Sequence, residues 1–272
     1  MPYWRLSGFY FFYFAVLGAL VPYWGLYLEY RGFSPLQIGQ LMAVLMGTKI
    51  VGPYIWGWIA DHTGRRMAIV RLASLLSIVT FLGVFWADGF WMLALVMALF
   101  SFFWNASLPQ FEAVTFSHLG LGVQDYSRVR LWGSVGFILV VSGVGVLVDL
   151  RDPSVVPQVL LLCFVAIWLS SLPVPERGGP RHPAAQEAIW QVIRRPWVLA
   201  FLAACFLMQA GHGAYYAFFS IYMQDTGYSK TLIGQLWTLG VVAEILVFLV
   251  MHRLMHRFGA RRVLLASLLL GA

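Results

Sequence analysis

The sequence predicts an all-α membrane protein, a bundle of helices that crosses the bilayer several times. Only 11% of the 272 residues are charged and 61% are hydrophobic, whereas a soluble domain carries roughly 25% charged residues. So few charges cannot cover a water-facing surface of this size, which excludes a soluble enzyme, a disordered chain and a secreted disulfide scaffold. The net charge of +7 does not indicate nucleic-acid binding, because the basic residues form short clusters between apolar runs.

Eight stretches of about 20 mostly apolar residues are long enough to cross the hydrocarbon core, where only helices satisfy their own backbone groups. Turn-forming residues separate the stretches, and Ser34 followed by Pro35 has the pattern of a helix N-cap. A ninth apolar stretch begins at Val263, and we expect the chain to hold only the start of that helix. The eight stretches are 6–28, 36–60, 67–87, 91–117, 131–150, 155–172, 197–223 and 231–251.

Basic residues indicate the orientation of the chain, because arginine and lysine accumulate on the cytosolic side of membrane proteins. The joints on one side hold only Arg31, Arg151 and Lys230. We therefore expect the N-terminus, which lies on the other side, to be cytosolic. The basic residues on that richer side are Arg5, Arg65, Arg66, Arg71, Arg128, Arg130, Arg177, Arg181, Arg194, Arg195, Arg253, Arg257, Arg261 and Arg262.

The chain partly repeats itself after 195 residues. Residues 32–41 (GFSPLQIGQL) align with residues 227–236 (GYSKTLIGQL), and six of the ten positions are identical. Because six predicted spans separate the two copies, both run the same way through the membrane. Parallel six-helix repeats are typical of one large class of transporters, whose substrate site lies between the halves.

The repeat predicts three parts. Residues 1–174 form a first six-helix bundle, residues 175–196 form a cytosolic linker rich in proline and arginine, and residues 197–272 form a partial second bundle with helices seven, eight and the start of nine. Two complete repeats would need roughly 390 residues. We therefore expect this chain to be a fragment, truncated in helix nine.

Residues 57–66 (GWIADHTGRR) resemble the signature loop of the major facilitator superfamily, Gly-x-x-x-Asp-x-x-Gly-Arg-Arg/Lys, between helices two and three. The resemblance implies that superfamily's fold, a six-helix half followed here by part of the second half. A charge-assisted bond between Asp61 and the arginines would latch one conformation; alternatively, the arginines only set the topology. The residues of this latch loop are Gly57, Asp61, Gly64, Arg65 and Arg66.

Residues 125–135, 209–216 and 236–244 resemble the phenylpropionate permease family. A more distant resemblance connects the chain to the lactose permease family. Glu112 and Arg130, 18 residues apart, match the glutamate and arginine by which that family holds sugar. The resemblance therefore implies a substrate-site role for Glu112 and Arg130; the alternative is an interfacial salt bridge between them.

Three further ionisable residues lie inside the predicted spans. Lys49 and Glu244 occupy equivalent positions in the two repeats near mid-span, where a charge costs at least ~2.5–3.5 kcal/mol. We expect them to face the solute pathway, as an ion pair or as alternating partners; the alternative is a static pair that only holds the halves together. His212 either relays protons or bonds substrate, or packs against a neighbouring helix.

These observations predict a secondary active transporter that works by alternating access. The resemblance implies proton-coupled symport of a small organic solute, an aromatic carboxylate similar to phenylpropionate, by a monomer in the bacterial inner membrane. Arg130 and Lys49 would attract the carboxylate, and Glu112 or Glu244 would carry the proton. The expected partners are the solute, the proton and the lipid bilayer, with no nucleic acid, cofactor or metal.

Other functions remain open at this point. Oligosaccharide–proton symport is favoured by Glu112 and Arg130, and a membrane sensor or scaffold that transports nothing is the alternative of another class. A membrane-embedded enzyme would need clustered catalytic groups, and the sequence contains no His-Glu-x-x-His, P-loop or Gly-x-Ser-x-Gly motif. We therefore do not expect an enzyme.

Overall fold

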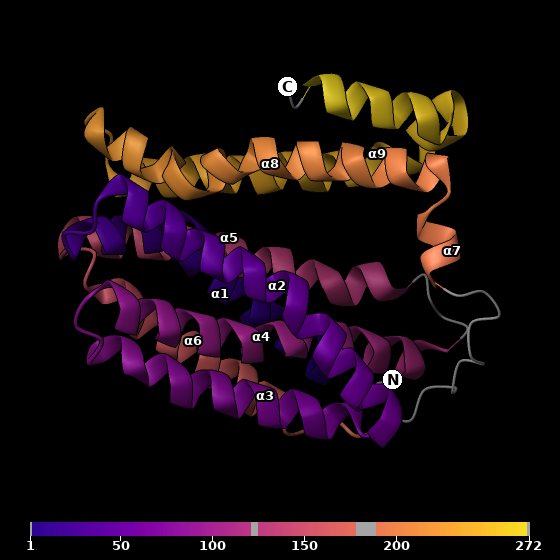
Figure 1. Ribbon diagram of the computed structural model, residues 1–272, viewed down its shortest axis with the longest axis horizontal. Coiled ribbons are helices and arrows are strands. Elements are labelled where there is room, and N and C mark those ends of the chain that lie inside the picture. Colours follow the sequence, from indigo (N-terminus) through magenta and orange to yellow (C-terminus); the bar gives the residue numbers. More distant parts are fainter. Residues whose placement is uncertain (1, 121–124, 178–188, 271–272) are drawn as a thin grey trace.

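The computed structural model describes residues 2–120, 125–177 and 189–270, and every element in these ranges is helical (Figure 1). Seven of the described helices are long and apolar enough to cross a membrane, and the predicted span at 155–172 is a shorter apolar helix of 17 residues. The predicted fold class is confirmed. The elements are α1 (Tyr3–Tyr30), α2 (Pro35–Thr63), α3 (Arg66–Phe81), the 3-10 turn η1 (Leu82–Phe85), α4 (Phe90–Leu119), α5 (Tyr126–Leu150), α6 (Val155–Ser171), α7 (Ile189–Ile193), α8 (Pro196–Asp225) and α9 (Lys230–Leu270).

The helices lie roughly parallel in one bundle (Figure 1). We call the end at which α1 begins the N-terminal end and the other the far end. Helices α1, α3, α5 and α8 run from the N-terminal end to the far end, and α2, α4, α6 and the first part of α9 run back. Much of the predicted linker, residues 178–188, lies outside the described residues, and α7 follows it at the N-terminal end.

The sequence repeat is also a structural repeat. The turn between α1 and α2 and the turn between α8 and α9 both contain a glycine with positive φ, 84° at Gly32 and 90° at Gly227. Ser34 caps α2, as predicted, and Ser229, its equivalent, caps α9 through the backbone of Leu232. Four backbone hydrogen bonds of the first turn recur in the second, with each residue number raised by 195. In the first turn, the N–H groups of residues 31, 32, 33 and 38 donate to the carbonyl groups of residues 27, 29, 28 and 34, respectively. In the second turn, the N–H groups of residues 226, 227, 228 and 233 donate to the carbonyl groups of residues 222, 224, 223 and 229.

The ninth helix begins where the repeat places it. Gly259, the equivalent of Gly64, has a φ of 77° and interrupts the helical backbone inside α9. Gly64 has a φ of 66° at the end of α2. Residues after Gly259 fold back beside the rest of α9 (Figure 1). A glycine with positive φ therefore ends the second helix of each copy.

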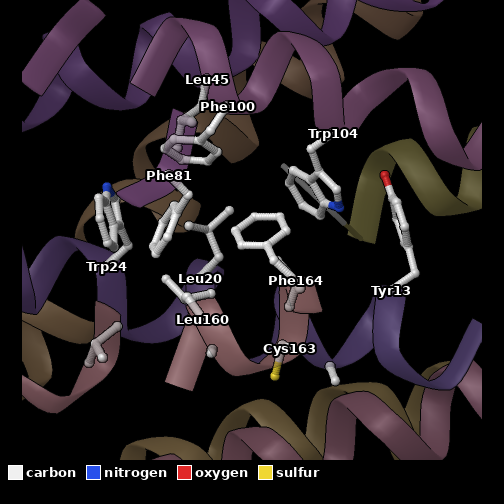
Figure 2. Close-up of a cluster of buried hydrophobic side chains, with 14 of the residues drawn as sticks. Tyr13, Leu20, Trp24, Leu45, Phe81, Phe100, Trp104, Leu160, Cys163 and Phe164 are labelled. Atoms are coloured by element: carbon white, nitrogen blue, oxygen red, sulfur yellow. The ribbon is translucent and has the colours of Figure 1, made fainter. Parts of the chain in front are cut away.

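An aromatic core lies between the first six helices, around α1 (Figure 2). Phe81 of α3 lies 5.0 Å from Phe164 of α6 and 5.1 Å from Phe100 of α4, measured between ring centroids. Trp24 of α1 closes the cluster at 6.1 Å from Phe81. Such ring contacts join four helices in the absence of water, where packing rather than the hydrophobic effect holds helices together.

Helices α1 and α5 approach each other so closely that only glycine fits between them. A Cβ atom on Gly136 would overlap the carbonyl oxygen of Phe11, and one on Gly18 would lie 2.7 Å from the carbonyl oxygen of Phe137. These two contacts bring the middle of α5 against α1, and the charged residues discussed below lie beside this contact. Small residues at a helix interface have this effect in membrane bundles.

We expect Gly136→Leu to destabilise the bundle, because the obstructing atoms belong to the backbone and cannot rotate away. Overpacking of this kind costs about 1–3 kcal/mol. The measurement is the thermal unfolding temperature of the purified protein in detergent, together with the folded yield. Gly143→Leu is the matched control, because a Cβ on Gly143 of the same helix meets nothing within 4 Å. Equal stability of the two variants would contradict the argument.

Candidate functional site

Two opposite charges lie in the interior of the first half, where α1, α4 and α5 meet. Glu112 of α4 and Arg130 of α5 are both partly buried, and Tyr13 and Tyr126 each lie within electrostatic range of both. Glu112 lies seven residues before the end of α4, about 10 Å from the N-terminal end at helical rise. The structure therefore brings together the pair that the sequence resemblance selected.

The two charges do not pair with each other in the part of the chain that the structure describes. Instead, the hydroxyl of Tyr126 donates a hydrogen bond of 3.0 Å to Oε1 of Glu112. The guanidinium carbon of Arg130 lies 3.6 Å from the centroid of the Phe14 ring, a cation–π contact. The expected alternative, a salt bridge between Glu112 and Arg130, is absent from this conformation because each group has a neutral partner.

Aromatic side chains continue the site toward the middle of the bundle. The Tyr13 ring stacks on Trp104 with centroids 5.2 Å apart, and Figure 2 shows the two rings beside the aromatic core. Trp104 is only 6% exposed, and among the described residues its indole N–H has no hydrogen-bond partner. A buried donor without a partner is unfavourable. The arrangement thus offers a cation, an anion, ring surfaces and an unused donor.

Sequence reasoning missed Phe14, Tyr13, Trp104 and Tyr126 as site residues. The spans are so rich in aromatic residues that composition alone selects none of them. One signal was available for Tyr126, which lies four residues before Arg130 and therefore on the same face of α5. No comparable signal marks the other three, because their positions depend on how the helices pack.

Lys49 and Glu244 do not meet. Both side chains are exposed, on α2 and α9, and no ion pair joins them within the described residues. The physical reason lies in the repeat, because equivalent residues touch only near the axis that relates the two copies. Glu29 and Gln224, 195 residues apart, do touch, and Gln224 Nε2 donates a 2.9 Å hydrogen bond to Glu29 Oε2.

Within the described residues, the contacts of His212 lie on its own helix, α8. Its Nδ1 lies 2.8 Å from the carbonyl oxygen of Met208 in the same helix. Its ring centroid lies 6.1 Å from that of Tyr216. The structure therefore places His212 near the middle of α8, apart from the Glu112 and Arg130 pair.

The signature loop forms a compact ionic contact at the N-terminal end. Nη2 of Arg66 lies 2.7 Å from Oδ1 of Asp61, and Nη1 of the same guanidinium donates a 2.7 Å hydrogen bond to Oε1 of Gln110 in α4. Gly64 turns the chain between the two charges, and a Cβ on Gly57 would lie 3.8 Å from the Gln110 amide nitrogen. Arg65 is exposed. The loop thus connects the end of α2 and the start of α3 to Gln110 inside α4.

A second group of contacts joins the two halves at the far end. The carboxylate of Asp149 in α5 accepts the backbone N–H groups of Lys230 and Thr231, at 2.9 and 2.7 Å, and the Thr231 hydroxyl at 2.6 Å. The Tyr23 hydroxyl of α1 donates to the carbonyl oxygen of Val141 at 2.7 Å. Sequence reasoning assigned no role to Asp149, although an acidic group at a helix N-terminus is a common cap.

An open pocket of about 420 Å³ lies beside these contacts, lined by Glu29, Asp149, Asp152 and Lys230 among others. Hydrogen bonds from Ser154 hold the pKa of the Asp152 carboxyl below its usual range. The pocket is at the opposite end of α5 from Arg130. It therefore belongs to the contacts at the far end and not to the site of Glu112 and Arg130.

The chain is similar to a known protein family, to curated proteins and to a solved structure. A model of the "MFS_1 like family" matches residues 3–272. The chain is 33% identical over 269 residues to a "Probable 3-phenylpropionic acid transporter" of Escherichia coli (strain K12), covering 96% of the chain and 70% of that protein. It is 28% identical to a "Maltose permease" of Geobacillus stearothermophilus, covering 97% and 68%. The crystal structure of the nucleoside transporter NupG (D323A mutant) superimposes with a TM-score of 0.81 at 16% identity, covering 96% of the chain and 70% of that structure.

Proposed function

Because this chain belongs to the MFS_1 like family of membrane transporters, we propose that it serves the proton-coupled symport of a small aromatic carboxylate. The relatives are transporters and not enzymes. The chain spans about 70% of the length of the first relative, so the transport cycle is proposed for the protein as a whole. A phenylpropionate-like solute is the substrate that the site and this relative favour.

The observation that carries the proposal is the guanidinium of Arg130. It is partly buried in the bundle against the Phe14 ring, and it forms no ion pair with any residue that the structure describes. A charge in such surroundings is retained where it has a function, and arginine binds carboxylates in a planar, two-pronged geometry. Phe14, Tyr13 and Trp104 provide ring surfaces beside it for an aromatic ligand.

The remaining predicted residues have roles in the proposed cycle. Glu112 or Glu244 carries the proton, Lys49 adds positive charge along the pathway, and His212 assists in proton transfer or substrate binding. The loop of Gly57, Asp61, Gly64, Arg65 and Arg66 stabilises one conformation through the Asp61–Arg66 pair. The two halves rock about the central site, with the N-terminus in the cytosol and the protein acting as a monomer in the bacterial inner membrane.

The proposal predicts which solutes the full-length protein accumulates. In membrane vesicles with an imposed inward proton gradient, labelled 3-phenylpropionate is expected to enter at least about tenfold faster than in vesicles without the protein, and a protonophore is expected to abolish the difference. The uncharged 3-phenylpropionamide serves as the matched control solute. Equal uptake of the acid with and without the gradient would contradict proton coupling.

A second candidate function is oligosaccharide–proton symport, because the maltose permease relative and the Glu112 and Arg130 pair both fit it. Labelled maltose and lactose in the same vesicles separate the two. Accumulation of a sugar without accumulation of the acid favours this candidate. Absence of flux for every solute under the gradient favours a sensor or scaffold instead.

A further inference from the structure

We propose that Tyr126 is a positioning residue that holds Glu112 away from Arg130 and thereby keeps the guanidinium available to an anionic substrate. The inference rests on the proposed function, because it assigns the preference for anions to a residue beside the proposed carboxylate site. It concerns a side chain that acts through Glu112 and has no charge of its own at neutral pH.

The charges of Glu112 and Arg130 predict an ion pair that does not form. Opposite charges in a partly desolvated interior attract each other more strongly than in water. Glu112 and Arg130 nevertheless form no ion pair with each other or with another described residue. The carboxylate accepts from the Tyr126 hydroxyl at 3.0 Å, and the guanidinium lies on the Phe14 ring. These two neutral contacts replace the pair.

The Tyr126 ring is held in the orientation that this contact requires. It stacks on Phe116, with centroids 4.7 Å apart and planes 22° apart. Phe116 lies four residues after Glu112, one turn along the same face of α4. The edge of the Tyr10 ring lies on it at 6.2 Å. Packing therefore fixes the phenol over the face of α4 that carries Glu112, and its hydroxyl points to the carboxylate.

The hydrogen bond between Tyr126 and Glu112 leaves Arg130 accessible to an anionic substrate. With Glu112 held by Tyr126, a carboxylate substrate reaches Arg130 without first breaking an ion pair of the protein. Without the hydroxyl, Glu112 is free to turn toward Arg130 and compete with the substrate. The apparent Kd for the acid then equals the intrinsic Kd divided by the fraction of molecules in which Arg130 remains unpaired. A neutral ligand meets no such competition, so only the affinity for anions depends on the hydroxyl.

Tyr126→Phe tests the inference, because it retains the stacking on Phe116 and removes only the hydroxyl. The measurement is the Kd of the purified full-length protein for 3-phenylpropionate and for 3-phenylpropionamide. If Glu112 pairs with Arg130 in nine-tenths of the variant molecules, the Kd for the acid rises about tenfold while the Kd for the amide stays within twofold. Tyr3→Phe is the matched control. It removes a hydroxyl of α1 that donates to the backbone carbonyl oxygen of Arg128 and has no contact with Glu112 or Tyr126 among the described residues, and both Kd values should stay within twofold.

A double variant isolates the competition itself. Glu112→Gln removes the competing carboxylate, so adding Tyr126→Phe to it should leave the Kd for the acid unchanged. The inference is overturned if Tyr126→Phe binds the acid as tightly as the wild type, or if the loss is as large in the Glu112→Gln background. Arg130→Gln distinguishes a failure of this inference from a failure of the proposed function. If Arg130→Gln abolishes binding of the acid while Tyr126→Phe has no effect, only this inference fails. If Arg130→Gln also binds the acid normally, the proposed function fails.

Discussion

Arg130→Gln should abolish accumulation of 3-phenylpropionate. The variant keeps a planar polar side chain but loses the positive charge that the substrate carboxylate needs. Removing one partner from a buried, hydrogen-bonded charge pair costs about 2–5 kcal/mol, which corresponds to a loss of affinity of at least about 30-fold. The measurement is the initial rate of uptake over a range of substrate concentrations in vesicles that contain equal amounts of folded protein.

Two further variants make this result specific. Arg130→Lys keeps the charge but loses the two-pronged geometry and the flat contact with Phe14, so an intermediate loss of about tenfold is expected. Arg128→Gln is the control, because Arg128 is exposed and pairs with Asp125 at the start of α5. Wild-type uptake by Arg130→Gln would show that the substrate is bound elsewhere and would refute the proposed site.

Gly234→Trp should block transport by holding the far end open. A Cβ on Gly234 of α9 would overlap the Tyr23 hydroxyl of α1 and lie 2.7 Å from the carbonyl oxygen of Val141 in α5. Gly145 of α5 faces the same contact, and its Cβ would lie 2.6 Å from the carbonyl oxygen of Lys230. The obstructing atoms are mostly backbone, so an indole at this position forces α9 away from α5.

Alternating access needs both ends to close in turn, and a change of about 5.5 kcal/mol is enough to move a two-state equilibrium from one extreme to the other. We expect active uptake to fall by more than about 100-fold, while substrate binding persists. Opening is measured at Thr238, whose hydroxyl lies 3.1 Å from that of Ser142 across the contact between α9 and α5. In a background with Cys163 and Cys205 replaced by serine, Thr238→Cys should react faster with a polar maleimide when Gly234→Trp is present.

Gly240→Trp provides the matched control, because a Cβ on Gly240 of the same helix meets nothing within 4 Å. It should leave both uptake and the reactivity at position 238 near wild type. Normal uptake by Gly234→Trp would show that the cycle tolerates a separated far end. The contact of Tyr23, Gly145 and Gly234 would then have a structural role alone.

The sequence predicted the two charged residues of the candidate site but not their partners. Glu112 and Arg130 were selected because their spacing resembles that of a sugar-binding pair, and the structure places them in one interior region. The resemblance did not reveal that each charge has a neutral partner. Which partner a side chain finds depends on the rotation of its helix, and each residue along a helix turns by about 100°.

For Lys49 and Glu244, the sequence did not predict the spatial arrangement. Their equivalence in the repeat is a property of the sequence, but equivalence says nothing about distance from the axis that relates the copies. Glu29 and Gln224 lie close to that axis and touch, whereas Lys49 and Glu244 lie on exposed faces. Their proposed roles therefore concern the pathway and not a mutual ion pair in this conformation.

The sequence by itself determined the membrane class, the helical spans, the internal repeat and the turns that bound each helix. These features are local, because hydropathy, caps such as Ser34 and left-handed glycines such as Gly64 act within a few residues of their own position. Only the tertiary structure decided which charges stay unpaired, which aromatic rings surround them and where the halves touch. Those outcomes depend on close approaches between distant helices, such as Gly136 against Phe11, that no single segment can specify.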